Sequence, residues 1–473
     1  MSVLAASGFV AEFTVPVVVI GGGAAGMIAA LAACEAGAEV LLIERDRLPS
    51  GSTALSAGLV PAAGTRWQAA LGIVDTPALF AADIMAKAHD APDPAVVSLV
   101  TREAGPALEW LADRHGLAFS VISDFRYPGH AVYRMHGLPT RSGAELIDAL
   151  RQAVDRAEIT LLCDARVTSL AADATGRVVG VVVERPDGSQ ERVGCAALVL
   201  ACNGYGGNPA LVAEHLPDMA GALYFGHPGN QGDAVIWGAG LGAATRHLGG
   251  HQGHGSVAHP IGILITWATI TEGGFQVNAG GARFADESRG YSEAASAVLA
   301  QERGVAWTVF DARIAAIARQ FADYRAAEAA GVILTAANPA LLAAAMRVPV
   351  AAFVESFAGV SALKQAAGRD AFGRDFADVA DLRAPLHAVR VTGALFHTQG
   401  GLVVDAAARV VRADGCGVLP NLLAAGGAAC GVSGDTAAGY LSGNGLLTAV
   451  ALGRMAGRWA EIIARHSLQN IQG

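Results

Sequence analysis

The stretch VVVIGGGAAG, residues 17–26, decides how the chain begins to fold. An alanine-rich run, 27–36, follows it, and a second apolar run, 39–43, ends on the acid Glu44. Because β-forming residues lead into glycines and helix formers follow, this order predicts a strand, a tight turn, a helix and a second strand. Such a β-α-β unit is the context in which the fingerprint G-x-G-x-x-G binds a pyrophosphate.

Each residue of the fingerprint has a physical role in that interpretation. Gly21 allows the sharp turn, Gly23 lets the backbone approach a pyrophosphate, and Gly26 lets the helix pack closely on the strand. The N–H groups at the start of the helix then face the phosphates, and Glu44 can accept hydrogen bonds from a ribose diol. An ordinary glycine-rich turn would require neither the helix nor the acid, so we predict a bound dinucleotide.

The composition limits the classes to which the chain can belong. Its 473 residues predict two domains or one large interrupted domain, and 53% apolar with 16% charged residues predict a large core. The net charge of −9 provides no basic face for nucleic acid. Residues 1–13 lack the pattern of a signal peptide, and the longest apolar run, 260–270, is too short to span a bilayer. Six scattered cysteines without a C-x-x-C pair favour a reducing cytoplasm.

Two further segments point to the same sheet and cofactor. Residues 50–58 are small and rich in hydroxyls, so they can pass close to a flat cofactor, although a plain Ser/Gly loop would look the same. The apolar run 197–202 leads into the glycine-rich run 203–208, and this second strand-to-glycine switch indicates a return to the first sheet. Residues 238–243 partly mimic the fingerprint but follow a helical pattern, so we predict no second dinucleotide fold for NAD(P).

The middle of the chain has a different sequence pattern. His251, His254 and His259 lie within nine positions of a glycine-rich loop, but their spacing fits no common zinc pattern, so we predict no metal site. A long helical stretch with two breaks is predicted for residues 311–367. The polar run 133–141 is expected to be a solvated loop, with pocket lining as the alternative.

Taken in order, several segments resemble the FAD-dependent fumarate reductase and 3-ketosteroid dehydrogenase superfamily. They are residues 21–44, 52–58, 200–206, 231–233, 277–287, 397–401 and 424–426. The resemblance covers nearly the whole chain and implies an α/β fold, with a Rossmann-like FAD-binding domain built from both chain ends. It implies residues 1–248 and 375–473 for this domain, an inserted α+β capping domain at 249–374, and the flavin at the domain junction.

The resemblance implies one bound FAD, and departures from the family pattern bear on how it is held. Ser52 stands where tethered relatives carry a histidine, so we expect FAD to be non-covalent. Gly427 replaces an acid that commonly follows the A-A-G motif, which leaves one ribityl or ribose contact of the family unaccounted for. The FAD-binding residues implied by the family positions are Gly21, Gly23, Ala25, Gly26, Glu44, Arg45, Ser52, Thr53, Ala57, Gly58, Val167, Cys202, Asn203, Gly204, Asn208, Asp233, Gly426, Gly443, Asn444, Gly445 and Leu446.

Two family arginines that meet substrate carboxylates are replaced by tyrosines in this chain. Tyr291 follows an R-F motif, and Tyr440 opens a Y-L-S-G-N run. A tyrosine cannot form a bidentate cationic fork, but its O–H can donate to a neutral carbonyl. The pair is similar to the ketosteroid dehydrogenase branch, and Ser442 is similar to the branch that desaturates 3-ketosteroids between carbons four and five.

The resemblance therefore implies an FAD-dependent oxidoreductase that dehydrogenates or reduces a C–C bond next to the carbonyl of a cyclic ketone or enone. Hydride would pass through flavin N5, while Tyr440 and the backbone N–H groups of residues 443–445 would hold the carbonyl oxygen. Tyr291 would be the acid/base, with Ser442 as a relay, and His397 would donate to a substrate oxygen. The physiological direction and the electron donor or acceptor stay open.

Two alternatives remain at the level of sequence. One is a fumarate-reductase-like enzyme for a carboxylated substrate, which would use Arg289, Arg134 or Arg141 as the carboxylate clamp. The other is a flavoprotein that carries electrons or senses redox state without turning over a carbon substrate. The match to a capping domain argues against the second, because a carrier needs no closed pocket for a small-molecule substrate.

Overall fold

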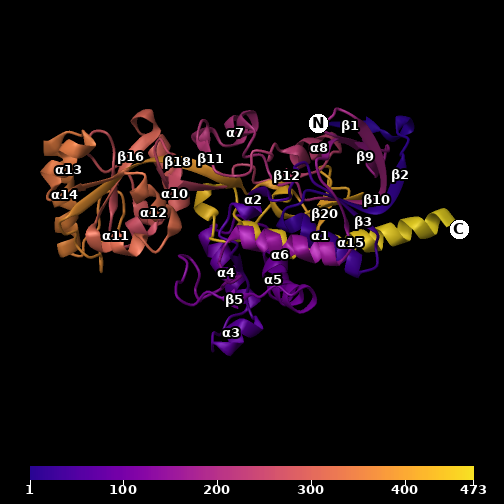
Figure 1. Cartoon of the computed structure of the whole chain (residues 1–473), viewed down its shortest axis with the longest axis horizontal. Coiled ribbons are helices and arrows are strands. Elements are labelled where there is room, and N and C mark those ends of the chain that lie inside the picture. Colours follow the sequence, from indigo (N-terminus) through magenta and orange to yellow (C-terminus); the bar gives the residue numbers. More distant parts are fainter. Residues whose placement is uncertain (473) are drawn as a thin grey trace. The chain divides into compact units, whose positions relative to one another are not determined.

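The computed structural model describes residues 1–472, and the chain forms two compact units, which are described separately below. The first unit contains Met1–Leu211, Gly226–His251 and the chain from His397 onward. The second contains Val212–Phe225 and Gln252–Phe396. Their elements are labelled in Figure 1.

A nine-stranded sheet forms the core of the first unit. Its order is β1-β8-β9-β10-β2-β3-β7, with β21 paired to β10 and β20 paired to β21. The strands are β1 Ser2–Ala5, β2 Phe13–Ile20, β3 Val40–Ile43, β7 Thr160–Leu162, β8 Arg166–Ala172, β9 Val178–Glu184, β10 Gln190–Leu200, β20 Arg409–Val411 and β21 Val418–Ala424. The strands β21, β10, β2, β3 and β7 run parallel, so the loops after β2, β3, β10 and β21 leave the sheet at one edge.

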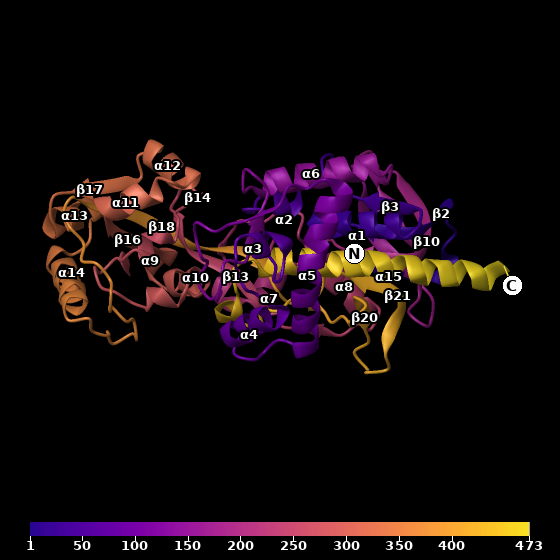
Figure 2. The same ribbon diagram turned by 90° about the horizontal axis from the view of Figure 1, so that it is seen from below.

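Two helices cover this parallel region. Helix α1 (Ala24–Glu35) joins β2 to β3, as the first stretch of sequence predicts, and α15 (Asn444–Gln472) lies beside it (Figure 2). A Cβ atom at Gly457 would lie 2.1 Å from the carbonyl oxygen of Ala29, so only glycine allows the two backbones to approach this closely.

The rest of the first unit is helical, with short strands. Its remaining elements are α2 Gly51–Ala54, β4 Val60–Pro61, α3 Arg66–Ala70, α4 Pro77–Lys87, α5 Pro94–His115, β5 Ser120–Val121, β6 Met135–Gly137, α6 Gly143–Arg156, α8 Asp233–Gly240, β12 Thr245–Arg246 and β19 Gly401–Leu402, and α7 Pro209–His215 begins in it. Helix α6 is capped by Ser142, whose Oγ accepts a hydrogen bond from the Glu145 N–H.

The second unit is built on a seven-stranded sheet with helices around it (Figure 1). The sheet order is β14-β13-β18-β16-β15, and β11 and β17 also pair with β18. Its elements are β11 Leu223–Tyr224, β13 His251–Ala258, β14 Ile263–Leu264, α9 Ala268–Thr271, β15 Phe275–Val277, α10 Tyr291–Leu299, β16 Val305–Asp311, α11 Ala312–Ala318, α12 Ala322–Ala329, β17 Ile333–Ala336, α13 Pro339–Met346, α14 Val350–Gln365 and β18 Leu386–Thr398.

Three details of this arrangement differ from the local sequence pattern. The second unit runs on to Phe396, because β18 pairs with β16 and β17, whereas the sequence predicts a capping domain at 249–374. The stretch predicted as helical, 311–367, contains the strand β17. The run 133–141 is not a solvated loop throughout, since β6 lies within it and Arg134 is buried. The capping role of residues 249–374 stays a prediction.

Candidate active site

The glycine turn after β2 has the geometry that the fingerprint predicts. Gly21 has φ +108°, and a Cβ atom there would lie 2.5 Å from the carbonyl oxygen of Ala201. A Cβ atom at Gly26 would lie 1.8 Å from the carbonyl oxygen of Gly21, so α1 can approach the turn only with glycine at that position. At Gly23 the nearest atom to such a Cβ is 3.7 Å away, which leaves the backbone open to a ligand.

The carboxylate of Glu44 lies against this turn. Its Oε2 accepts a hydrogen bond from the Gly22 N–H at 2.7 Å, and its Oε1 accepts one from the Asp46 N–H at 2.9 Å. The side chain is buried, and desolvation raises its pKa. Because a carboxylate offers about four acceptor positions, two remain for the hydroxyls of a ribose.

The hydroxyl-rich run beyond β3 meets the start of α1. Thr53 Oγ1 accepts a hydrogen bond of 3.1 Å from the Ala24 N–H, at the first position of the helix. Ser52 Oγ accepts hydrogen bonds from the His227 N–H and from Asn230 Nδ2, at 3.2 and 2.9 Å. These bonds hold the run beside the N–H groups that α1 cannot pair internally.

The second strand-to-glycine switch returns to the same sheet edge, as predicted. In the register of β10 with β2, Leu200 is paired with Ile20, so Cys202 and Asn203 follow directly beside the glycine turn. Asn203 has φ 65°, and Gly204 follows it. Burial raises the pKa of the Cys202 thiol, so this cysteine stays protonated and packs.

Two buried oxygens of this unit have no hydrogen-bond partner among the described residues. They are Oδ1 of Asp233, the first residue of α8, and Oδ1 of Asn444, the first residue of α15. Buried acceptors are usually satisfied, so both call for a group that presents O–H or N–H donors. The ribityl hydroxyls and ring N–H of FAD are such donors, and with the glycine turn and Glu44 these residues fit FAD.

Three of the predicted catalytic residues lie in the first unit. Tyr440 is buried, and its ring meets that of His397 edge-on, with centroids 5.4 Å apart. Burial lowers the pKa of His397 to about 4, so the imidazole is neutral near pH 7. The Ser442 carbonyl is 3.0 Å from Nε2 of His130, and Gly443 follows with φ 89°.

His130, which the sequence did not single out, supports the loop around Ser442. Arg134 Nη1 donates to Nδ1 of His130, at 3.2 Å, so His130 must carry its proton on Nε2 and donate it to the Ser442 carbonyl. Burial lowers the pKa of His130 to about 4, which keeps it neutral. No local pattern reveals this role, because His130 lies 312 positions from Ser442.

Tyr291 belongs to the second unit, where it begins α10. Its ring stacks on His254, with centroids 5.1 Å apart, and it packs against Trp267 and Ile270. Burial lowers the pKa of His254 to about 3, so this histidine is uncharged. The rings of His254 and Trp267 beside Tyr291 are therefore uncharged, whereas Arg289 on the preceding turn is exposed.

Two of the three arginines considered for a carboxylate clamp, Arg134 and Arg141, have other partners. Arg134 is buried, with Nε and Nη2 on the two oxygens of Asp75 at 2.8 Å each and Nη1 on Asp83 at 2.6 Å. Arg141 pairs with Asp124 at the surface. The guanidinium of Arg134 is thus fully engaged inside the protein.

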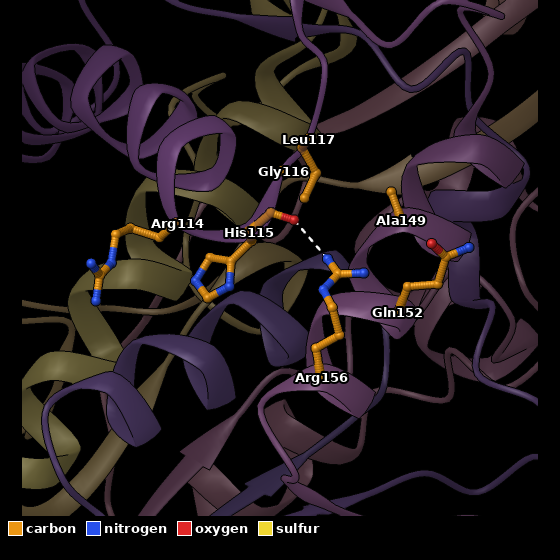
Figure 3. A pocket seen from close by; sticks show the side chains of 7 residues that line it. All are labelled: Arg114, His115, Gly116, Leu117, Ala149, Gln152 and Arg156. Atoms are coloured by element: carbon orange, nitrogen blue, oxygen red, sulfur yellow. Dashed lines mark hydrogen bonds between the residues drawn. The ribbon is translucent and has the colours of Figure 1, made fainter.

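A cavity of about 370 Å³ lies elsewhere in the first unit, at the C-terminal ends of α5 and α6 (Figure 3). It is lined by Arg114, His115, Gln152 and Arg156 among others, and Arg156 Nη2 donates to the His115 carbonyl at 2.7 Å. No predicted site residue lines it, so this cavity plays no part in the site described above.

Within residues 1–472, no group of three or more His, Cys, Asp or Glu side chains is arranged to hold a metal ion. Over the same part of the chain, no helix combines the length and apolar character needed to cross a membrane.

Comparisons with known proteins agree with this geometry. The family model described as FAD binding domain matches residues 16–446. A probable fumarate reductase of Shewanella frigidimarina is 30% identical over 460 residues, which cover 96% of this chain and 76% of the relative. The open form of a flavocytochrome c3 fumarate reductase superposes with a TM-score of 0.83 at 28% identity, covering 97% of this chain and 80% of that chain. A 3-ketosteroid-Δ4-(5α)-dehydrogenase of Rhodococcus jostii has the same fold, with a TM-score of 0.77 at 23% identity, covering 97% of this chain and 99% of that chain.

The match to the family model spans nearly the whole chain and includes the glycine turn, Glu44 and the start of α15. The chain therefore belongs to the FAD binding domain family and is an FAD-dependent oxidoreductase.

Proposed function

We propose that this protein dehydrogenates or reduces a C–C bond α,β to the carbonyl of a neutral cyclic ketone or enone. The observation that carries the proposal is the pairing of Tyr440 with His397, which presents two uncharged side chains where a carboxylate would need a cation. Both are hydrogen-bond donors of the kind that suit a carbonyl oxygen.

The glycine turn, Glu44 and the start of α15 would hold FAD, and the flavin would supply hydride exchange through its N5. We infer that it is bound non-covalently. The hydroxyl of Ser52, at the position of the family tether, accepts two hydrogen bonds from neighbouring protein groups and fixes the loop instead.

Tyr440 stabilises the enolate oxygen that forms as the α-proton leaves. Its O–H donates to that oxygen, and the backbone N–H groups of residues 443–445 add to the effect where α15 begins. His397 is a second neutral donor. His130 holds the loop around Ser442 in place through its hydrogen bond to the Ser442 carbonyl.

Tyr291 moves the α-proton. An unperturbed tyrosine titrates near pH 10, so in the reductive direction its O–H delivers the α-proton. In the dehydrogenation direction Tyr291 first gives its own proton to water and then takes the α-proton, and Arg289 on the preceding turn favours that loss. Its neighbours His254 and Trp267 are uncharged. They therefore favour a substrate with a neutral ring over a dicarboxylate substrate.

The second candidate is a reductase of a carboxylated substrate. The specific observation in its favour is the 30% identity to a probable fumarate reductase. Against it stand the engagement of Arg134 with Asp75 and Asp83 and the tyrosines at both family arginine positions.

The test compares two phenylalanine variants by anaerobic flavin reduction with a saturated cyclic ketone. Tyr440→Phe should slow both α-proton exchange and flavin reduction roughly a hundredfold or more, as loss of an oxyanion donor does. Tyr291→Phe should bind the ketone normally but lose exchange of the α-hydrogen with deuterated solvent. Arg141→Ala, whose partner lies at the surface, is the matched control and should behave as wild type. Tyrosine variants that turn over like wild type would overturn the proposal.

A further inference from the structure

A chain of three side-chain hydrogen bonds ends on the imidazole of His397. Asn444 Nδ2 donates to Ser433 Oγ at 2.9 Å, and Ser433 Oγ donates to Gln399 Oε1 at 2.8 Å. Gln399 Nε2 lies 2.7 Å from Nδ1 of His397. Asn444, Ser433 and Gln399 are all buried.

The direction of this chain follows from the donors and acceptors available. An amide nitrogen can only donate, so Asn444 Nδ2 occupies the Ser433 oxygen as an acceptor and directs the single hydroxyl proton to Gln399 Oε1. The amide nitrogen of Gln399 then faces His397 and donates to its Nδ1. Nδ1 also lies 3.4 Å from the Thr398 carbonyl, a much longer contact than the 2.7 Å to Gln399, so the bond from Gln399 decides the tautomer.

We propose that Gln399 is a positioning residue that holds His397 as the neutral Nε2–H tautomer, so that His397 donates to a substrate oxygen. This inference rests on the proposed function for the identity of that oxygen. With the proton on Nδ1, the Nε2 lone pair would face a carbonyl oxygen and repel it. The relay through Ser433 and Asn444 therefore determines whether His397 is a donor or an acceptor.

The surroundings of His397 agree with a neutral donor. The groups that face it are the ring of Tyr440, the imidazole of His251 and the start of α15. Burial and the neighbouring His251 disfavour an imidazolium, with burial the larger effect. A Cβ atom at Gly445 would lie 3.1 Å from Nε2 of His397, so glycine at this position leaves room for the Nε2 edge of the ring.

The tautomer can be measured without turnover, by ¹⁵N NMR of the FAD-loaded protein labelled at histidine. The protonated and unprotonated ring nitrogens differ widely in chemical shift, and His397→Gln assigns the signals.

Wild type should show Nδ1 unprotonated and Nε2 protonated. Gln399→Glu should move the proton to Nδ1, because the carboxylate can only accept and therefore requires Nδ1–H. Gln399→Met and Ser433→Ala should give a mixture of tautomers, and Gln320→Glu, an exposed change, should leave the spectrum unaltered.

Kinetics then connect the tautomer to function. Gln399→Met should raise KM for a cyclic enone at least tenfold. Gln399→Asn keeps an amide and should therefore raise KM less than Gln399→Met does. An Nδ1–H signal in wild type, or unchanged His397 shifts in Gln399→Glu, would overturn the inference. If the NMR result holds and no ketone or enone reacts, it is the proposed function that fails.

Discussion

Glu44 Oε2 accepts a hydrogen bond of 2.7 Å from the backbone N–H of Gly22. The acid at the end of β3 therefore holds the glycine turn at the end of β2. Because two of its acceptor positions are already used, Glu44 is held in one orientation in which the others can meet a ribose.

Glu44→Ala should weaken FAD binding by roughly ten- to a hundredfold, since hydrogen bonds to a charged acceptor are worth about 1.5–3 kcal/mol. Turnover per bound flavin should stay near wild type, because the adenosine ribose is remote from N5. Titration of the apoprotein with FAD measures the first effect, and Glu39→Ala, exposed on the same β-α-β unit, is the control. A collapse of turnover per bound flavin would count against this role.

Acid denaturation should release FAD. The prediction follows from Ser52, whose hydroxyl is bonded to His227 and Asn230 at the position of the family tether. After acid precipitation and centrifugation, the yellow colour should remain in the supernatant. Colour that stays with the protein pellet would show a covalent bond and would refute the non-covalent assignment.

Arg134→Ala should destabilise the fold by about 3–5 kcal/mol, because it leaves the buried carboxylates of Asp75 and Asp83 unpaired. Arg141→Ala removes an exposed ion pair and should change the free energy of unfolding by no more than about 1 kcal/mol. Urea unfolding of the FAD-loaded variants measures both. An Arg134 variant as stable as wild type that no longer binds substrate would instead support a carboxylate clamp.

The first unit should become less stable as the pH is lowered, because of His136. Burial lowers its pKa to about 4, and Nε2 bonds to Thr65 and Nδ1 to the Arg134 carbonyl. The unfolded chain takes up this proton near pH 6.5, so the stabilisation is complete above that pH and is lost as pH falls towards 4. Between about pH 7.5 and 5.5, His136 should account for a loss of about 1 kcal/mol.

Urea unfolding at the two pH values should show a shallower dependence in His136→Gln than in wild type. His89→Gln, an exposed change, is the matched control and should keep the wild-type slope. Equal slopes in His136→Gln and wild type would contradict the assignment.

Much of the fold could be predicted from the sequence because its signals are local. The β2-α1-β3 unit and the capped helix α6 are read from residues a few positions apart, and the glycine requirement at Gly21 and Gly26 is a matter of backbone geometry. Strand β17 was missed because its four residues lie between helices and are held as a strand by pairing with β18.

The parts of the site that could not be predicted depend on distant partners. Arg134 meets Asp75 and Asp83 across 59 and 51 positions, so nothing in the polar run 133–141 reveals its burial. Gln399 meets Ser433 across 34 positions, and only the folded chain shows that their bonds lead to His397. Position in a family motif singled out His397, and three-dimensional contacts found the residues that support it.

We propose that the substrate carries a neutral carbonyl and is not held through a carboxylate. The most direct test reduces the FAD-loaded protein anaerobically and mixes it in separate experiments with a cyclic enone and with fumarate, following the return of oxidised flavin absorbance. Because Tyr440 and His397 present uncharged donors, the enone should reoxidise the flavin in a saturable reaction and fumarate should do so far more slowly. Rapid reoxidation by fumarate with no reaction of the enone would contradict the account.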